Sequence, residues 1–125
     1  MTAFCPRYQE AVELIGRRWN GAVVRMLVAR PRRFAELAAG IPDISDRMLS
    51  ERLRELEGAG VVSRSVVPDI PVRVEYSLTD KGLDLETAIR SLARWAERWI
   101  DDESAPRPKA SGGRQPTRAK ARKAG

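Results

Sequence analysis

The chain has 125 residues, of which 42% are hydrophobic and 32% are charged, and its formal net charge is +6. This length allows one compact domain, and the balance is typical of a globular protein. Uncharged stretches are too short to span a bilayer, and Arg7, Glu10 and Glu13 interrupt any secretory signal, so we expect a cytoplasmic protein without a membrane partner. The chain has no histidine and a single cysteine, Cys5, which excludes a Ser-His-Asp triad, a Cys/His zinc site and an intrachain disulfide. We therefore expect no enzyme, no metal site and no cofactor.

The positive charge is concentrated at the C-terminal end. Residues 104–125 contain seven basic residues and no acidic residue, so residues 1–103 sum to −1. This segment has no apolar side chains beyond alanine, proline aside, and cannot bury enough surface to offset its chain entropy. It predicts a disordered basic tail after a single domain at 1–103. Two roles remain open for the tail, a solubilising extension or an arm that attracts phosphate regardless of sequence.

The first half of the chain predicts four helices, because apolar residues recur there at helical spacing between prolines, glycines and capping residues. The expected ranges are 7–15, 20–28, 34–41 and 45–58. Ser45 is expected to cap the fourth helix. The buried stripe of that helix consists of Leu49, Leu53 and Leu56.

A β-hairpin and a last helix follow. Residues 61–67 are rich in β-branched side chains, residues 68–71 form a turn, and residues 72–78 alternate. The alternation places Val72, Val74, Tyr76 and Leu78 on the inner face, with Arg73 pointing outward. Thr79 is expected to cap one long helix through residue 99.

This order of elements predicts a winged helix-turn-helix: mainly α, with a small β-hairpin. The fourth helix would enter the major groove of DNA, because an α-helix fits that groove and its side chains then reach base edges. The side opposite the leucines presents Arg47, Ser50, Glu51 and Arg54, of which the two arginines are the first candidates for reading guanine.

Other residues are candidates for the DNA backbone. Arg32 and Arg33 precede the third helix, Ser45 begins the fourth, and Arg73 leaves the hairpin turn. Arg52 lies nearer the buried flank, where its stem packs and its head would reach a phosphate. Each arginine also has a structural explanation as a solvated or paired surface residue, such as an i,i+4 pair of Arg47 with Glu51.

Several short motifs lie along residues 5–100 and leave out the tail. They are Cys5-Pro6, Leu14-Ile15-Gly16 with Trp19, Pro31 to Leu37, Ile44-Ser45, Met48-Leu49, Arg52 to Glu57, Gly60-Val61-Val62 and Pro71 to Thr79. Together these segments resemble the HxlR family of bacterial transcriptional regulators, which is related to the MarR type.

The resemblance implies a homodimer that is held by the first and last helices and binds a pseudo-palindromic operator in double-stranded DNA. The stripe with Leu92, Trp95 and Trp99 on the last helix agrees, because it is large for a core of this size to cover, and Tyr8 on the first helix joins the expected interface. Packing of that stripe against the second helix of the same chain is the alternative.

The family also implies a role for Cys5, because some members carry a sensor of oxidants or electrophiles at this position. A helix N-terminus and the nearby Arg7 both favour a thiolate. The alternative is a buried cysteine that acts as a small hydrophobe.

We therefore expect a sequence-specific transcriptional regulator that responds to an unknown small-molecule or oxidant effector. We expect a repressor, although the sequence does not decide between repression and activation. The alternative is a winged-helix module for nonspecific DNA binding or protein contacts.

Overall fold

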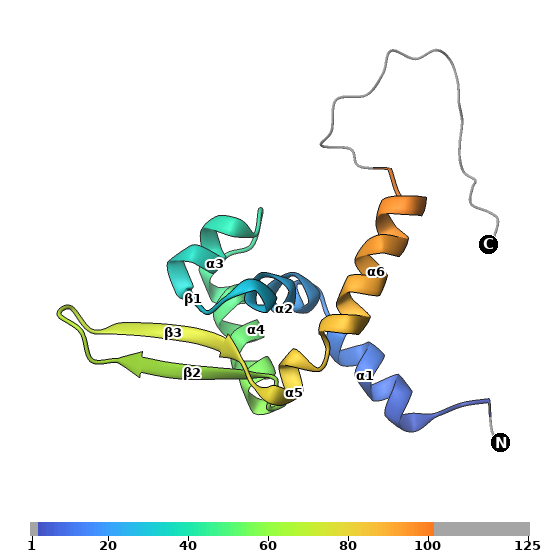
Figure 1. Ribbon diagram of the computed structural model, residues 1–125, viewed down its shortest axis with the longest axis horizontal. Coiled ribbons are helices and arrows are strands. Elements are labelled where there is room, and N and C mark those ends of the chain that lie inside the picture. Colours follow the sequence, from blue (N-terminus) through green and yellow to red (C-terminus); the bar gives the residue numbers. More distant parts are fainter. Residues whose placement is uncertain (1–2, 102–125) are drawn as a thin grey trace, which may run out of the picture. The chain divides into compact units, whose positions relative to one another are not determined.

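The computed structural model describes residues 3–101 and divides between Thr87 and Ala88 into two compact units, each described by itself. The predicted tail at 104–125 and the end of the predicted domain lie outside the described residues. The first unit contains the helices α1 (Pro6–Gly16), α2 (Asn20–Ala29), α3 (Phe34–Gly40), α4 (Asp46–Gly58) and α5 (Asp80–Leu83) and the strands β1 (Arg32–Arg33), β2 (Val62–Val67) and β3 (Arg73–Leu78) (Figure 1). The helix α6 (Glu86–Trp99) forms most of the described part of the second unit.

The four predicted helices of the first half are confirmed to within a few residues. Ser45 caps α4 as expected, because its hydroxyl oxygen accepts a hydrogen bond from the backbone N–H of Met48 at 3.0 Å. The predicted stripe of α4 is fully inside. The core of the first unit is built from Val23, Val24, Leu27, Leu37, Ile41, Leu49, Leu53, Leu56, Val61 and Val62.

A short turn joins α3 to α4 and makes the helix-turn-helix. Asp43 in this turn adopts a left-handed backbone with φ of 67°, a conformation that aspartate tolerates better than most residues. After the turn the chain enters α4, whose leucines lie in the core of the first unit (Figure 1). The helix expected to read DNA is therefore packed against the core on the side opposite its polar face.

The hairpin is present, and it gains a third strand that the sequence did not predict. The antiparallel sheet has the order β1-β3-β2, with Val62 opposite Leu78 and Arg33 opposite Glu75. The expected inner face is wrong at Val72, which is exposed because the far half of the hairpin extends beyond the helices of the first unit (Figure 1).

The predicted single last helix is wrong, because the chain forms two helices with a break at Asp84 and Leu85. Thr79 does cap a helix, but that helix is the one-turn α5, in which the Thr79 hydroxyl accepts from the N–H of Gly82 at 3.1 Å. A Cβ at Gly82 would clash with the carbonyl oxygen of Val61, so glycine permits the close approach of α5 to the start of the hairpin.

Candidate nucleic-acid interface

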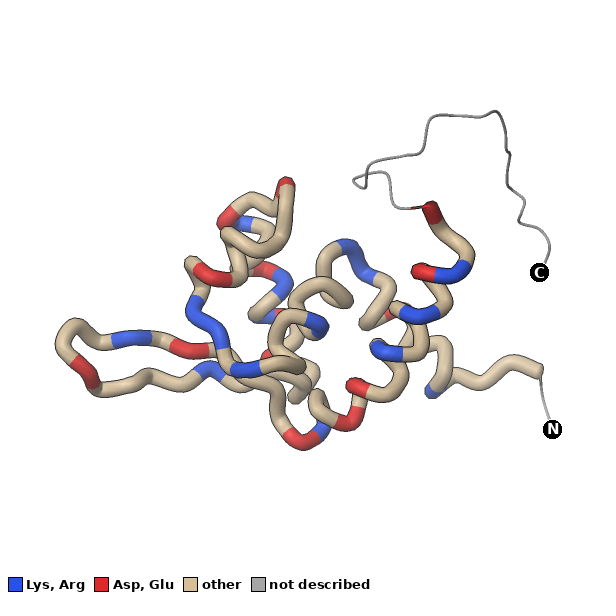
Figure 2. Tube along the Cα trace, turned by 45° about the horizontal axis from the view of Figure 1, so that its top comes forward, with Lys and Arg blue, Asp and Glu red and all other residues tan. Residues whose placement is uncertain are grey.

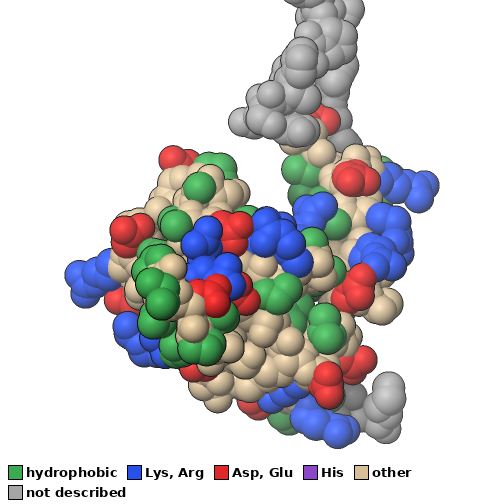
Figure 3. All heavy atoms as spheres, turned by 60° about the vertical axis from the view of Figure 1, so that its left-hand side comes forward, with side chains coloured by type: hydrophobic (Ala, Val, Ile, Leu, Met, Phe, Trp, Pro, Cys, Tyr) green, Lys and Arg blue, Asp and Glu red, His purple; other side chains and the backbone are tan. Residues whose placement is uncertain are grey.

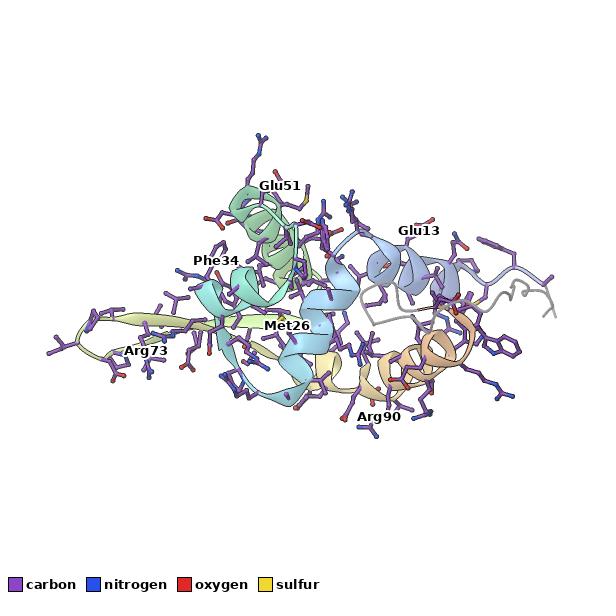
Figure 4. The ribbon with its side chains drawn as sticks, turned by 90° about the horizontal axis from the view of Figure 1, so that it is seen from above. Glu13, Met26, Phe34, Glu51, Arg73 and Arg90 are labelled. Atoms are coloured by element: carbon purple, nitrogen blue, oxygen red, sulfur yellow. The ribbon has the colours of Figure 1, made fainter. Side chains whose placement is uncertain are left out.

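The outer face of α4 is polar, and its two arginines are exposed. The Arg47 side chain is 89% exposed, and Arg54 also faces solvent. Glu51 and Ser50 are half-buried between them. Figure 4 shows Glu51 on the part of α4 that stands clear of α2, with side chains that project outward.

Arg47 forms the surface ion pair with Glu51 that the sequence analysis gave as its alternative explanation. Its Nε lies 3.3 Å from Oε2 of Glu51, as an i,i+4 ion pair. Exposed pairs of this kind contribute about 0–1 kcal/mol, whereas a bidentate contact to guanine discriminates by roughly 1–3 kcal/mol. The pair is therefore weak enough for Arg47 to exchange it for a base. Arg54 has no ion-pair partner within residues 3–101.

Arg52, a predicted contact to the DNA backbone, is buried in the structure. Its side chain is only 11% exposed, and Nη1 lies 2.8 Å from Oε1 of Glu55. Its Nε lies 3.2 Å from the sulfur of Met48. A buried guanidinium with these partners is poorly placed for a phosphate contact. The packed stem was expected, and the i,i+3 spacing of Arg52 and Glu55 was the sequence signal for the pair that holds its head group.

Arg32 and Arg33 form β1, directly before α3. Arg33 is exposed, whereas Arg32 is half-buried and its Nε donates to the carbonyl oxygen of Met26 at 3.3 Å. The backbone N–H of Arg33 donates to Glu36 at 2.8 Å, and Arg30 donates to the same carboxylate at 3.0 Å. These hydrogen bonds, the one from the Arg33 backbone first, lower the pKa of Glu36 from 4.5 to about 2. The charged carboxylate of Glu36 therefore caps the N-terminus of α3 by accepting from the Arg33 backbone. The Arg33 side chain itself has no ion pair among the described residues.

The hairpin places its two arginines in different surroundings. Arg73 is half-buried, with Nη2 lying 2.9 Å from Asp69 and 3.8 Å from Glu75. Arg73, predicted to point outward and to contact phosphate, is thus held between two carboxylates that already balance its charge. Figure 2 shows these opposite charges close together along the hairpin (Figure 2). Arg64 on β2 is exposed and has no such partner in the described part of the chain, so it is the freer cation. Its place on an expected strand was the only sequence signal for it.

The end of the hairpin is apolar. Val66, Ile70 and Val72 are all exposed there, and Ile70 is fully so. Figure 3, which brings the hairpin forward, shows hydrophobic side chains there, beside basic and acidic ones. Because the hairpin arginines alone bear its positive charge, the hairpin offers a phosphate backbone few contacts.

Cys5 is exposed and is the N-cap residue of α1, so the alternative of a buried cysteine is wrong. Its carbonyl oxygen accepts the hydrogen bond from the N–H of Gln9 at 3.0 Å, which leaves the thiol outside the helix. Phe4, Tyr8 and Val12 are exposed beside it. The N-terminal end of α1 therefore presents both a thiol and apolar side chains to solvent.

The second unit also presents apolar side chains. On α6, Trp95 and Trp99 are 54% and 51% exposed, and Leu92 is exposed as well. Arg98 lies over the ring of Trp99, with its guanidinium carbon 5.4 Å from the ring centre. The three residues predicted for the interface are thus exposed, whereas Ile89, earlier in the same stripe, is buried.

Residues 3–101 lack two features that would point to another function. None of the described helices is both long and apolar enough to cross a membrane. Three or more metal-ligating side chains do not come together in that range either.

The sequence of the chain is similar to helix-turn-helix regulators. Residues 14–104 match the family model described as HxlR-like helix-turn-helix. The chain is 48% identical over 97 residues to YvaP of Bacillus subtilis (strain 168), described as an uncharacterized HTH-type transcriptional regulator, across 78% of this chain and 90% of YvaP. It is 42% identical over 97 residues to the HTH-type transcriptional regulator YodB of the same organism, across 78% of this chain and 87% of YodB.

Solved structures of these regulators share the fold. The reduced form of YodB matches with a TM-score of 0.71 at 41% identity, covering 82% of this chain and 99% of YodB. The redox regulator HypR in its oxidized form matches with a TM-score of 0.73 at 37% identity, covering 78% of this chain and all of HypR (100%). YodB has also been solved after diamide treatment and with quinone bound, and these match at 0.67 and 0.66, each at 40% identity, covering 81% and 76% of this chain and 100% and 99% of YodB. The predicted winged helix-turn-helix is confirmed, and the chain belongs to the HxlR-like helix-turn-helix family of transcriptional regulators.

Proposed function

We propose that this chain binds a specific operator in double-stranded DNA, with α4 in the major groove. The observation that supports this most is the outer face of α4, where Arg47 and Arg54 are exposed opposite buried leucines. A helix placed in the groove by a rigid core brings such side chains to base edges, and arginine bonds guanine with two donors. Arg33, Ser45 and Arg64 are the proposed phosphate contacts, with Arg32 beside them.

The proposal includes a homodimer on a pseudo-palindromic operator. Exposed apolar side chains on α1 and on α6 support it, because large apolar side chains that stay in solvent commonly mark an interface. One α4 per half-site then requires two recognition helices about one helical turn of DNA apart. A dimer on an operator that overlaps a promoter excludes the polymerase, so the proposed sign of regulation is repression.

The experiment for DNA binding compares two duplexes of equal length, one selected from a random pool by this protein and one of random sequence. Their affinities are measured by fluorescence anisotropy over a range of salt. Specific complexes are typically 10³-fold or more tighter than nonspecific ones, and we expect at least roughly that ratio. Equal affinities at every salt concentration would contradict the proposal.

The second candidate is nonspecific binding driven by the basic tail, whose seven basic residues support it. Removal of residues 104–125 separates the two. If the tail provides most of the affinity, the shortened chain loses nearly all binding. If α4 does, the shortened chain keeps its preference for the selected duplex and loses only a salt-sensitive part of the affinity.

Cys5 is the proposed point of response to oxidants and electrophiles. Its exposure at the N-terminus of α1 supports this, as do the YodB structures with diamide treatment and bound quinone. Diamide takes two electrons and two protons from two thiols, so a disulfide here needs Cys5 of two protomers. A quinone instead adds to one thiolate.

Replacement of Cys5 by serine tests this role. In reducing buffer the Cys5→Ser variant is expected to bind the selected duplex as the wild type does, because the side chain lies outside the reading helix. With diamide or quinone added, only the wild type is expected to change its affinity, as measured by anisotropy. A wild type that ignores both reagents, or a variant that still responds, rules the role out.

A further inference from the structure

Glu55 gathers three hydrogen-bond or ion-pair donors on the inner flank of α4. Its Oε1 accepts from Nη1 of Arg52 at 2.8 Å and from Nδ2 of Asn20 at 3.3 Å. Its Oε2 lies 3.3 Å from Nε of Arg17. Both carboxylate oxygens are therefore occupied, and two of the three partners lie outside α4: Arg17 in the turn after α1, and Asn20 as the first residue of α2.

Asn20 connects this cluster to the end of α1. It is completely buried, and its Nδ2 also donates to the carbonyl oxygen of Leu14 at 2.7 Å. The amide nitrogen thus faces two acceptors, which fixes the orientation of the side chain, because a flipped amide would bring its oxygen against both. The Oδ1 atom is buried without a partner, so Asn20 is retained here at the cost of one unsatisfied acceptor.

The turn between α1 and α2 has an unusual backbone conformation at Trp19. Trp19, between Arg17 and Asn20, has a φ of 78°, a left-handed conformation that a bulky residue keeps only where its surroundings impose it. The contacts of Arg17 and Asn20 with Glu55, on either side of Trp19, provide such surroundings. The turn and α4 therefore hold each other in place.

We propose that Glu55 is a positioning residue: through Arg17 and Asn20 it ties the end of α1 to α4 and so sets where Arg47 and Arg54 stand on the DNA. This inference rests on the proposed function. Glu55 lies on the flank of α4, between the exposed side that carries Arg47 and the buried leucines, and its partners are Arg52, Asn20 and Arg17 rather than a reading arginine. It therefore acts on reading through the placement of the helix. It also links the helix that begins at Cys5 to the helix that reads bases.

The test replaces Arg17, the exposed member of the cluster, by alanine. Its side chain is 53% exposed, so the fold should tolerate the change, which a thermal melt verifies. The control is Arg18→Ala, which removes the same charge from the same turn but takes away a contact with the ring of Trp19 instead of Glu55. Both are measured by anisotropy on the selected duplex and on a random-sequence duplex.

Relative to Arg18→Ala, we expect Arg17→Ala to weaken binding to the selected duplex roughly 2- to 30-fold, with unchanged binding to random sequence and an unchanged salt slope. Arg17→Lys, which keeps a cation beside Glu55, should restore most of the loss. If the two alanine variants have equal effects, the inference is overturned. The proposed function is judged separately, by whether the wild type prefers the selected duplex over random sequence. A loss on both duplexes with a salt slope lower by about one also overturns it, because Arg17 would then be a phosphate contact.

Discussion

At the scale of single residues, neighbouring charges decide which arginines remain available. Arg47 and Arg52 both lie on α4, but Arg47 is 89% exposed on a weak surface pair, whereas Arg52 is 11% exposed against Glu55. The leucine stripe predicts which side of α4 faces solvent, and that part of the site could be predicted from the sequence. Contacts between distant segments could not be predicted from the sequence, since residues such as Asn20 and Glu55 are 35 positions apart along the chain.

The same reasoning separates the two hairpin arginines. Arg64→Ala is expected to weaken binding to every duplex alike, roughly fivefold at about 0.15 M salt, and to lower the salt slope by about one, because one phosphate contact is lost. The matched control is the double variant Arg73→Ala, Asp69→Asn, which removes a pair and keeps the net charge. Anisotropy over a salt series should show no change in its slope. If the double variant weakens binding more than Arg64→Ala does, Arg73 rather than Arg64 is the phosphate contact.

At the scale of elements, periodic patterns predicted the helices well and short or interrupted elements poorly. The strand β1 has two residues, too few for any alternation, and it exists because β3 lies beside it. The break between α5 and α6 was missed because the apolar repeat runs through it. The one-turn α5 before the break packs closely on Val61 through Gly82, and such a contact between segments leaves no periodic signal.

The start of α3 has a pH dependence that follows from Glu36. The pKa of this carboxyl is lowered to about 2, so its charge stabilises the folded state above about pH 4.5, and this contribution is lost as the pH falls toward 2. At pH 7 the Glu36→Gln variant should therefore melt at a lower temperature than the wild type, and the difference should shrink steadily below about pH 4.5.

Thermal melts between pH 7 and pH 3 check this expectation. Glu57→Gln is the control, because Glu57 is exposed and its carboxylate has no hydrogen bond or ion pair within residues 3–101. Its melting temperature should differ from that of the wild type by a small amount that does not vary with pH. A constant difference for Glu36→Gln as well would show that the carboxylate does not act through its charge.

At the scale of the whole molecule, the exposed apolar side chains of α1 and α6 lead to the proposed dimer. Buried tryptophans at an interface commonly contribute 2 kcal/mol or more, so Trp95→Ala or Trp99→Ala should raise the dimer Kd roughly 30-fold. Sedimentation equilibrium measures this directly. Val66→Ala, which removes an exposed apolar side chain from the hairpin, should leave the Kd unchanged. A wild type that sediments as a monomer at all concentrations would contradict the proposed dimer.

The central claim is that the outer face of α4 reads base edges, and parallel selection of duplexes from one random pool tests it most directly. The wild type, Arg47→Ala and Arg54→Ala are each used for selection, and the bound DNA is sequenced. The wild type should enrich a two-fold-symmetric motif, and each variant should lose preference at one position in both half-sites, at a cost of about 1–3 kcal/mol on the original motif. The same motif from all three proteins, or no motif from the wild type, would contradict the claim.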